Sequence, residues 1–295
     1  MSKAVRTVSA DTLKPAMSIS VAIQGYRGAF HDIAVQKYFG AKNLDIIETD
    51  TFDQIVDKVT NKQVDFGAMA IENTIYGMLM PNFNLLHRSR VFIDGEISLR
   101  IKQNLICWPG ISLEEIKEVH SHPIAIEQCR EFFKSYPQIK LIESVDTAYS
   151  VKEIKEKRLK TRGAIASTLA ADIYGMHVLV PSIETNKKNF TRFLIVEKKS
   201  KSAILPKANK ASIIFTLADK VGSLHQVLSQ LSNHEANLTK IQSIPILGKP
   251  FEYAFWVDLI SNDAQQLMEA IEKIKPFIHE LKILGIYPKG IHYEH

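Results

Sequence analysis

Residues 64–71 read Val-Asp-Phe-Gly-Ala-Met-Ala-Ile, and this short, mostly apolar run decides the fold of the first two-thirds of the chain. A run of this length is typical of a strand that is buried on both faces, as in a parallel sheet. Parallel strands need long connections, usually helices, so the flanking residues should alternate between helical and strand patterns. The chain is 45% hydrophobic, which is enough to bury such a sheet.

The residues on both sides of this run do alternate in this way. Close to it, strands are predicted at 17–23, 44–48 and 91–97, and helices at 30–39, 55–59 and 79–87. A second series has strands predicted at 101–107, 119–120, 140–142, 163–166 and 177–180, helices at 124–134, 146–157 and 168–174, and a last strand at 190–196. These patterns predict an α/β domain at 17–199 with two lobes, 17–97 plus 185–199 and 98–184. Doubly wound sheets with a cleft between them would give a periplasmic-binding-protein-like arrangement.

A polar, lysine-rich segment after Glu197 marks the end of this domain, and we expect a linker at 200–210. Beyond it the predicted order is strand, helix, strand, strand, helix, strand, at 211–217, 222–233, 238–246, 251–259, 264–274 and 281–287. Gly248, Lys249 and Pro250 would form the turn between the two middle strands. This order is the ferredoxin-like βαββαβ plan, so a smaller domain is predicted at 211–290.

The composition argues against several classes of protein. The net charge of +5 is mild for this length and the basic residues are scattered, so the sequence indicates no nucleic-acid partner. No apolar run approaches the roughly 18 residues that span a bilayer, and residues 1–16 lack the apolar core of a signal peptide. Cys107 and Cys129 fit neither a disulfide framework nor a metal-binding pattern. We therefore expect a cytoplasmic protein without a membrane partner and without a metal.

Polar residues follow the buried run at the point where its strand should end. Ligands of open α/β sheets bind outside the carboxyl ends of the strands. Glu72, Asn73 and Thr74 are therefore placed to hold a polar ligand. The alternative is a plain strand-to-helix turn in which the Asn or the Thr caps the helix.

Ser121 and His122 follow another predicted strand in the same way. Ser121 can equally be the N-cap of a helix that begins near Pro123, and such a helix end would also attract an anion. Gln128 lies two turns further along and can share a face with the cap, or it is an ordinary exposed glutamine. Glu143 follows a third strand, and its alternative is a solvated loop carboxylate.

The segment Asn189–Phe193 places a hydroxyl and a guanidinium next to each other in an apolar strand. Neighbouring strand residues point to opposite faces, so Thr191 and Arg192 can face one pocket only if the backbone is irregular there. The alternative is a β-prone threonine beside a surface arginine. The glycines at 24–28 are too sparse for a dinucleotide-binding loop, so no NAD is predicted, and no motif of a hydrolytic triad is present.

Several segments together resemble the prephenate dehydratase family, in the order in which that family has them. They are Gly25–Phe30 (GYRGAF), Ile71–Thr74 with Gly77, Ser121–Pro123 with Gln128 and Cys129, Ala164–Ser167 with Ala170, Ala171, Tyr174 and Gly175, and Asn189–Phe193 (NFTRF). The part after the linker resembles the ACT regulatory domain of the same family. Because no helical segment of the chorismate mutase type precedes Ile19, we expect a monofunctional enzyme.

The resemblance implies an activity: prephenate would lose water and carbon dioxide to give phenylpyruvate, on the route to phenylalanine, without a cofactor. It implies that Thr191 donates a proton to the leaving hydroxyl, and that Glu72 and Glu143 orient or polarise the site. The residues that it implies for substrate binding are Gly25, Asn73, Thr74, Ser121, His122, Gln128, Arg192 and Phe193. The family pattern differs here at His31, where a serine is usual, and at Ile124, where a glutamine is usual.

The resemblance also implies feedback control by phenylalanine and assembly into a homodimer or a homotetramer, because ACT domains bind ligands at subunit contacts. The residues expected at that effector site are Gly222, Ser223, Leu224, Gln242, Ser243 and Pro245. Where the family usually has Glu-Ser-Arg-Pro, this chain has Gln242 to Pro245 with Ile244 in place of the arginine. Two other functions stay open: a dehydratase that acts on arogenate, and a non-catalytic binding protein coupled to an amino-acid sensor.

Overall fold

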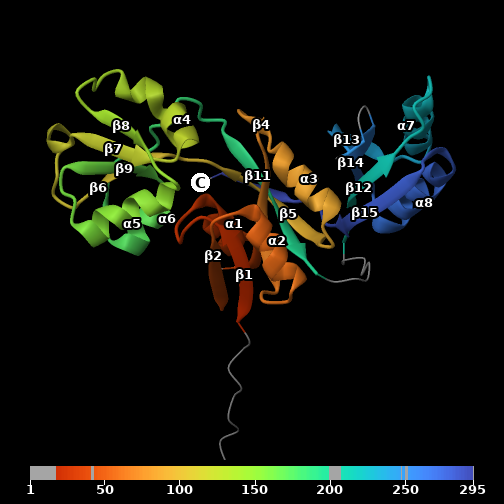
Figure 1. The fold of residues 1–295 in the computed structure, drawn as a ribbon, viewed down its shortest axis with the longest axis horizontal. Helices are drawn as coiled ribbons and strands as arrows, with labels where there is room; N and C mark the ends of the chain where they lie inside the picture. Colours follow the sequence, from red (N-terminus) through yellow and green to blue (C-terminus); the bar gives the residue numbers. More distant parts are fainter. Residues whose placement is uncertain (1–17, 41–42, 199–206, 247, 250–251, 295) are drawn as a thin grey trace, which may run out of the picture.

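The computed structural model describes residues 18–40, 43–198, 207–246, 248–249 and 252–294. The strands of these residues form three sheets with helices packed on them (Figure 1). The second sheet and the third sheet lie at opposite ends of the molecule, with the first sheet between them. Met17, most of the expected linker, Pro250 and Phe251 lie outside the described residues, so the predictions made for them are not addressed.

The first sheet contains the run that dominates the sequence. Its strands are β1 (Ile19–Gln24), β2 (Leu44–Thr49), β3 (Phe66–Asn73), β4 (Gly77–Met78), β5 (Phe92–Arg100), β11 (Phe190–Glu197) and β16 (Ile291–Tyr293), and its helices are α1 (Phe30–Phe39), α2 (Phe52–Thr60) and α3 (Met80–Arg88). The order is β16-β5-β11-β3-β1-β2, with β4 paired to β3. Ala68, Met69 and Ile71 of β3 are buried, as predicted for a strand covered on both faces. β1, β2 and β3 are parallel, but β11 runs antiparallel between β3 and β5 because the chain returns there from the second sheet.

The second sheet has the order β10-β6-β9-β7-β8. Its strands are β6 (Asn104–Cys107), β7 (Glu118–Ser121), β8 (Lys140–Glu143), β9 (Arg162–Ala166) and β10 (His177–Val180), and its helices are α4 (Pro123–Phe133), α5 (Thr147–Lys157), α6 (Thr168–Tyr174) and the 3-10 turn η1 (Leu113–Glu115). β7, β8 and β9 are parallel, whereas β6 and β10 are antiparallel to their neighbours. Two chain segments, after β5 and before β11, join this sheet to the first one.

The third sheet is antiparallel throughout and has the order β13-β14-β12-β15. Its strands are β12 (Lys210–Thr216), β13 (Asn237–Pro245), β14 (Tyr253–Ile260) and β15 (Glu280–Tyr287), and its helices are α7 (Ser223–Asn233), α8 (Ala264–Ile274) and the 3-10 turn η2 (Lys275–Phe277). α7 and α8 cover one face through a core that includes Phe215, Leu231 and Leu267. The other face packs on α3, where the rings of Trp256 and Phe83 meet edge to face with centroids 4.8 Å apart.

The third sheet is joined tightly to the first. A Cβ built on Gly285 of β15 would lie 2.3 Å from the carbonyl oxygen of Ile93 in β5. The chain then leaves the third sheet and adds β16 to the first sheet, parallel to β5, with Ile291 beside Ile97 and Tyr293 beside Leu99. This three-residue strand was not predicted from the sequence. In the described residues, no helix is both long enough and apolar enough to cross a membrane.

Candidate active site

A cavity of about 210 Å³ lies between the first and second sheets. Both sheets contribute to its wall, which is largely apolar with a few polar groups. Its lining residues are Gln24, Ala29, Phe30, His31, Ala70, Asn73, Tyr76, Gly77, Met78, Leu79, Ile101, Gln103, His122, Ile124, Ala125, Gln128, Asp146, Thr147, Thr191 and Phe193. An apolar pocket with a small number of placed polar groups is the usual form of a small-molecule site.

Thr191 and Asn73 form the polar centre of this cavity. They lie opposite each other on the antiparallel strands β11 and β3, and the amide nitrogen of Asn73 donates to the Thr191 hydroxyl oxygen at 2.9 Å. The orientation of the amide is fixed, because its oxygen accepts the backbone N–H groups of Ile75 and Tyr76 at 2.9 and 3.0 Å. Its nitrogen also donates to Asn189 at 2.7 Å.

This arrangement leaves the Thr191 hydroxyl with a proton to give. The oxygen of Thr191 already accepts from Asn73, and the described residues provide no acceptor for its own O–H. A hydroxyl that receives a hydrogen bond is a better donor in turn, because chains of hydrogen bonds polarise one another. The geometry therefore presents Thr191 as a donor to whatever occupies the cavity.

Two buried glutamines form a second polar group in the wall. The side-chain nitrogen of Gln103 donates to the side-chain oxygen of Gln128 at 3.1 Å. The backbone N–H of Gln103 is held by Glu184 at 2.9 Å, in the segment that joins the two sheets. The side-chain oxygen of Gln103 is buried and has no hydrogen-bond partner among the described residues. It is an acceptor that a bound molecule can satisfy.

Two helices begin at the cavity, and a helix N-terminus favours a bound anion. α1 begins at Phe30, and its N-cap Ala29 provides no side-chain cap, so the first N–H groups of this helix are free to bind a carboxylate. α4 begins at the same cavity with His122 as its N-cap, and the His122 Nδ1 accepts the N–H of Ile124 at 3.3 Å. An accepting Nδ1 puts the proton of the neutral ring on Nε2, which is a further donor. Burial lowers the pKa of His122, although Glu143 opposes this shift.

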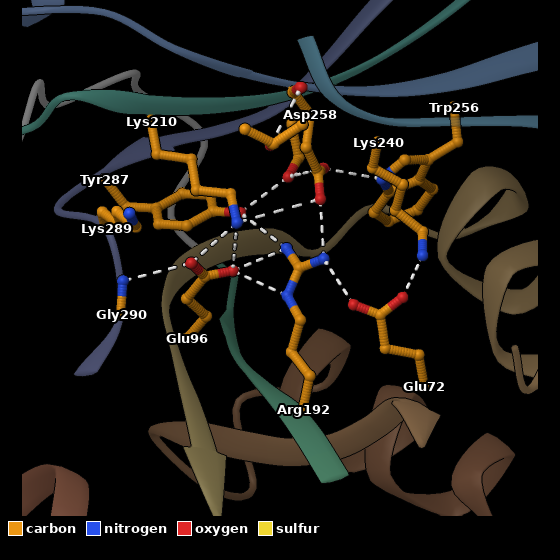
Figure 2. Close-up of polar contacts among 12 residues, drawn as sticks. Glu72, Glu96, Arg192, Lys210, Lys240, Trp256, Asp258, Tyr287, Lys289 and Gly290 are labelled. Carbon is orange, nitrogen blue, oxygen red and sulfur yellow. Dashed lines mark hydrogen bonds and ion pairs between the residues drawn. The ribbon is translucent and has the colours of Figure 1, made fainter. Parts of the chain in front are cut away.

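Glu72 and Arg192 do not contribute to the cavity, which corrects the roles expected for them. Strand alternation turns them to the opposite side of the sheet from Asn73 and Thr191. Figure 2 shows both side chains among those of the third sheet. There Arg192 pairs with Glu72, Glu96 and Asp258, and it is only 8% exposed. Burial alone would raise the pKa of Glu72, but Arg192 and Lys240 outweigh it and hold that pKa below its ordinary value.

Four more residues expected at the site are also absent from the cavity wall. Ser121 is buried and donates to the carbonyl oxygen of Ile165 at 2.6 Å, and the helix cap predicted for it is made by His122 instead. Thr74 donates to the carbonyl of Lys188 at 3.0 Å and so fastens the loop after β3 to the start of β11.

Glu143 lies at the exposed end of β8. Gly25 is buried beside the cavity, where a Cβ would stand 2.6 Å from a carboxylate oxygen of Asp146. Gly25 thus serves the approach of the two sheets and does not line the cavity.

The wall also contains polar residues that were not among the predicted site residues, including His31, Gln103 and Asp146. Asp146 is the N-cap of α5 and accepts the N–H of Tyr149 at 3.0 Å. Burial raises the pKa of Asp146, while backbone N–H groups of α5 oppose the shift. Burial lowers the pKa of His31 to about 4, so this ring is neutral near pH 7. The sequence marked His31 only as a departure from the family pattern, and it did not indicate Gln103, which lies between β5 and β6.

The residues expected to bind phenylalanine lie on the third sheet and on α7. Gly222 is the N-cap of α7 with a φ of 86°, and Ser223 and Leu224 begin that helix. Along β13, Gln242 lies opposite Trp256 and Ser243 lies opposite Phe255. Since Trp256 packs toward α3 and Phe255 toward the helices of the third sheet, only Ser243 of this pair shares a face with α7. Pro245 is exposed at the end of the strand.

The fold and the cavity define a mixed α/β enzyme of small-molecule chemistry, with a hydroxyl donor held between two sheets. The chain belongs to the prephenate dehydratase family, a family of lyases, because the model of that family, described as prephenate dehydratase, matches residues 21–201. A bifunctional chorismate mutase/prephenate dehydratase of Buchnera aphidicola is 34% identical over 267 residues, which cover 90% of this chain and 69% of the relative. Arogenate dehydratase 2 of Petunia hybrida is also 34% identical, over 92% of this chain and 72% of its own.

Solved structures share the fold. Prephenate dehydratase of Arthrobacter aurescens, in complex with L-Phe, has a TM-score of 0.82 at 24% identity and covers 92% of this chain and 90% of its own. A protein described as GqqA, a novel type of quorum quenching acylase, has a TM-score of 0.81 at 26% identity over 92% of this chain and 98% of its own. One fold thus carries different activities, and the assignment of function depends on the site.

Proposed function

We propose that this protein converts prephenate to phenylpyruvate, water and carbon dioxide, with the Thr191 hydroxyl as the proton donor to the departing ring hydroxyl. The bond from the ring to its carboxylate breaks, and its electron pair enters the ring, which becomes aromatic. The carbon–oxygen bond breaks at the opposite ring carbon, the oxygen takes the proton of Thr191 and leaves as water, and the Thr191 oxygen regains a proton from solvent. A donor placed at that oxygen accelerates the reaction because negative charge develops there.

The observation that carries this proposal is the Asn73–Thr191 hydrogen bond inside the cavity. A free threonine hydroxyl is a weak acid, so it needs a neighbour that polarises it and a fixed orientation. Asn73 provides both, because its amide is held by four hydrogen bonds to the loop after β3 and to β11. Phe193, two residues along the same strand face, supplies an apolar wall for a ring.

The two carboxylates of prephenate need donors, and none of the described residues that line the cavity is a lysine or an arginine. The uncapped N-terminus of α1 and the Nε2–H of His122 are suitable in their place. The buried oxygen of Gln103 can accept the substrate hydroxyl or a water. Glu72, Glu143, Ser121, Arg192 and Thr74 therefore have no direct contact with the substrate in this proposal.

Arogenate is the second candidate substrate, because the Petunia relative named for it is as similar as the Buchnera relative named for prephenate. Arogenate carries an amino group where prephenate carries a keto group. A cationic amine would favour a nearby carboxylate, and Asp146 is the carboxylate that lines the cavity. The rates on the two substrates, measured side by side, therefore decide between them.

We further propose that residues 211–290 form an ACT domain that binds L-phenylalanine, since the Arthrobacter prephenate dehydratase of the same fold forms a complex with L-Phe. β13 is an edge strand of the third sheet and exposes Ile241. An edge of this kind can pair with a second copy, which supports a homodimer or a homotetramer with effector sites between subunits. A cytoplasmic location fits the two buried, unpaired cysteines, Cys107 and Cys129.

The test is a turnover assay on prephenate and on arogenate, with and without L-phenylalanine, for the wild type, Thr191→Ala and Thr191→Ser. We expect phenylpyruvate from prephenate, a loss of about 100-fold or more in kcat for Thr191→Ala, and partial retention for Thr191→Ser, which keeps the hydroxyl. Both variants should unfold at the same urea concentration as the wild type. Full turnover by Thr191→Ala would remove the donor role, and faster turnover of arogenate would reassign the substrate.

A further inference from the structure

The two residues at the polar centre of the cavity each have a chain neighbour in contact with the third sheet. Arg192 follows Thr191 on β11, and Glu72 precedes Asn73 on β3. The register pairs Thr191 with Asn73 and Arg192 with Glu72, so one pair faces the cavity and the next pair faces the opposite side of the sheet. Figure 2 shows this second pair enclosed by side chains of the third sheet.

A buried set of charges, the interdomain ion cluster, joins the two sheets there. Its members are Glu72, Glu96, Arg192, Lys210, Lys240 and Asp258. Glu72, Glu96 and Arg192 belong to the first sheet, and Lys210, Lys240 and Asp258 belong to the third. Three carboxylates face three cations, so the cluster is neutral only when both sheets are in contact.

Arg192 is the centre of the cluster. Its Nε donates to Glu96 at 2.7 Å, and its Nη1 donates to Asp258 at 2.6 Å and to Glu72 at 3.3 Å. Its Nη2 reaches the hydroxyl of Tyr287 at 3.4 Å. Asp258 and Tyr287, which come from the third sheet, are completely buried.

The other charges fix the partners of Arg192. Lys210 donates to both carboxylate oxygens of Glu96, at 2.7 and 2.8 Å, and Lys240 bonds to Glu72. Asp258 also accepts from Ser212 at 2.6 Å and from Trp256 at 2.8 Å. Burial alone would raise the pKa of Asp258, but Arg192 and Lys210 outweigh it and hold that pKa below its ordinary value. Asp258 is therefore ionised and stays paired with Arg192.

We propose that Arg192 and Glu72 are positioning residues that carry the state of the third sheet to the Thr191–Asn73 pair. This inference rests on the proposed function. A buried charge is not easily separated from its partner, so a shift of β14 and β13 draws Arg192 and Glu72 with it. Each is one peptide unit from a residue of the cavity, so the shift changes the angle and the length of the Asn73–Thr191 hydrogen bond. A small misplacement of a catalytic group is enough to change a rate strongly.

The test variant is Asp258→Asn, which removes one charge with almost no change in volume and keeps an oxygen for Ser212 and Trp256. We expect kcat on prephenate to fall about 10- to 100-fold while KM stays within about twofold, because the group that is misplaced acts in the transition state. The concentration of L-phenylalanine that halves the rate should change by about fivefold or more. An unchanged kcat together with an unchanged phenylalanine response would overturn the proposal.

The matched control is Lys282→Met. Lys282 of β15 also joins the third sheet to the first, since it donates to the carbonyls of Leu86, His87 and Ser89 at 2.9, 2.6 and 2.7 Å. These groups lie at the end of α3 and make no bond to the interdomain ion cluster. The control should keep the wild-type kcat and phenylalanine response. Equal effects of Lys282→Met and Asp258→Asn would mean that any loosening of the third sheet suffices, which also overturns the proposal.

Lys240→Met is the second variant in case Asp258→Asn does not fold. It removes one partner of Glu72 at a strand edge, and it should lower kcat in the same direction with KM unchanged. Hydrogen exchange of the β11 amides on addition of L-phenylalanine gives a readout without turnover. A protection change in the wild type that is absent from both variants supports the coupling. If the wild type shows this protection change but forms no phenylpyruvate, only the proposed reaction is contradicted. If it forms phenylpyruvate but the variants show the same protection change as the wild type, only the coupling is contradicted.

Discussion

Gly28 and Ala170 are in direct contact across the boundary between the first and second sheets. A Cβ built on Gly28 would lie 2.6 Å from the Ala170 Cα, and Gly28 has a φ of 88°, in the left-handed region. The Ser167 hydroxyl donates to the Gly28 carbonyl at 2.5 Å, and the Tyr174 hydroxyl donates to the Arg27 carbonyl at 3.2 Å. The loop that begins at Gly25 is thus a third connection between the sheets, beside the two chain segments, and it closes one side of the cavity.

Replacing Gly28 with alanine should therefore lower the free energy of unfolding by more than the unfavourable backbone angle alone would. The left-handed conformation costs a non-glycine residue about 1–2 kcal/mol, and the overlap with Ala170 adds about 1–3 kcal/mol. Gly110→Ala is the control, because Gly110 has a φ of 82° and nothing within 4 Å of an added Cβ. Urea unfolding should show a larger loss for Gly28→Ala than for Gly110→Ala. Equal losses would mean that the contact with Ala170 is unimportant.

His31 should make the protein less stable as the pH falls from about 6.5 to about 4. Its ring packs edge-on against Phe193 with centroids 4.9 Å apart, and its Nε2 accepts the N–H of Ala70 at 3.4 Å. Burial lowers the pKa of His31 to about 4. In this pH window the unfolded chain binds a proton that the folded chain does not, so the free energy of unfolding falls by up to about 3 kcal/mol.

Urea midpoints of the wild type and His31→Phe between pH 7 and pH 4 check this expectation. Phenylalanine fits the same apolar contacts but carries no titrating group, so its stability should fall less steeply with acid. The other histidines contribute equally to both proteins and cancel in the difference. Parallel curves for the two proteins would contradict the assignment.

The sequence predicted most strands and helices of the three sheets, but not β4 or β16, because side-chain periodicity is a local property that short strands do not display. It also predicted that Thr191 and Arg192 face opposite sides if the backbone is regular, and the two residues do face opposite sides. It could not show which side holds the ligand. Glu72 pairs with Lys240, which lies 168 residues away in the sequence. A carboxylate at the end of a strand therefore resembled a site residue, although it pairs with a lysine of the third sheet.

Other differences have local causes. Pro123 is the first residue of α4, so the cap falls on His122 and not on Ser121, which is free to bond to β9. β16 has only three residues, too few to show a periodic pattern, and it is a strand only because β5 offers it an edge. Phe193 and Gln128 were predicted at the site from their motifs, and both line the cavity.

Gly285→Ala should loosen the third sheet from the first. The backbone of Gly285 has no unusual angle, so the added methyl group acts only through its 2.3 Å approach to the Ile93 carbonyl oxygen. Overpacking of this kind typically costs about 1–3 kcal/mol. We expect a lower urea midpoint and faster proteolysis between the first sheet and the third sheet. A variant as resistant as the wild type would show that β15 and β5 tolerate a wider separation.

Gln103 should contribute to substrate binding more than to stability. Its side-chain oxygen is buried without a partner among the described residues, while its nitrogen bonds to Gln128 at 3.1 Å. A hydrogen bond from the substrate to this oxygen is worth about 1–1.5 kcal/mol, which corresponds to about tenfold in KM. We expect Gln103→Met to raise KM for prephenate by about this factor with kcat little changed.

The control is Asn104→Leu, since the Asn104 side chain bonds to Ala166 and Ser182 and does not line the cavity. That variant should lose stability but keep its KM. If KM were unchanged in Gln103→Met, the unpaired oxygen would have to be satisfied by something other than the substrate, and Gln103 would have no part in substrate binding.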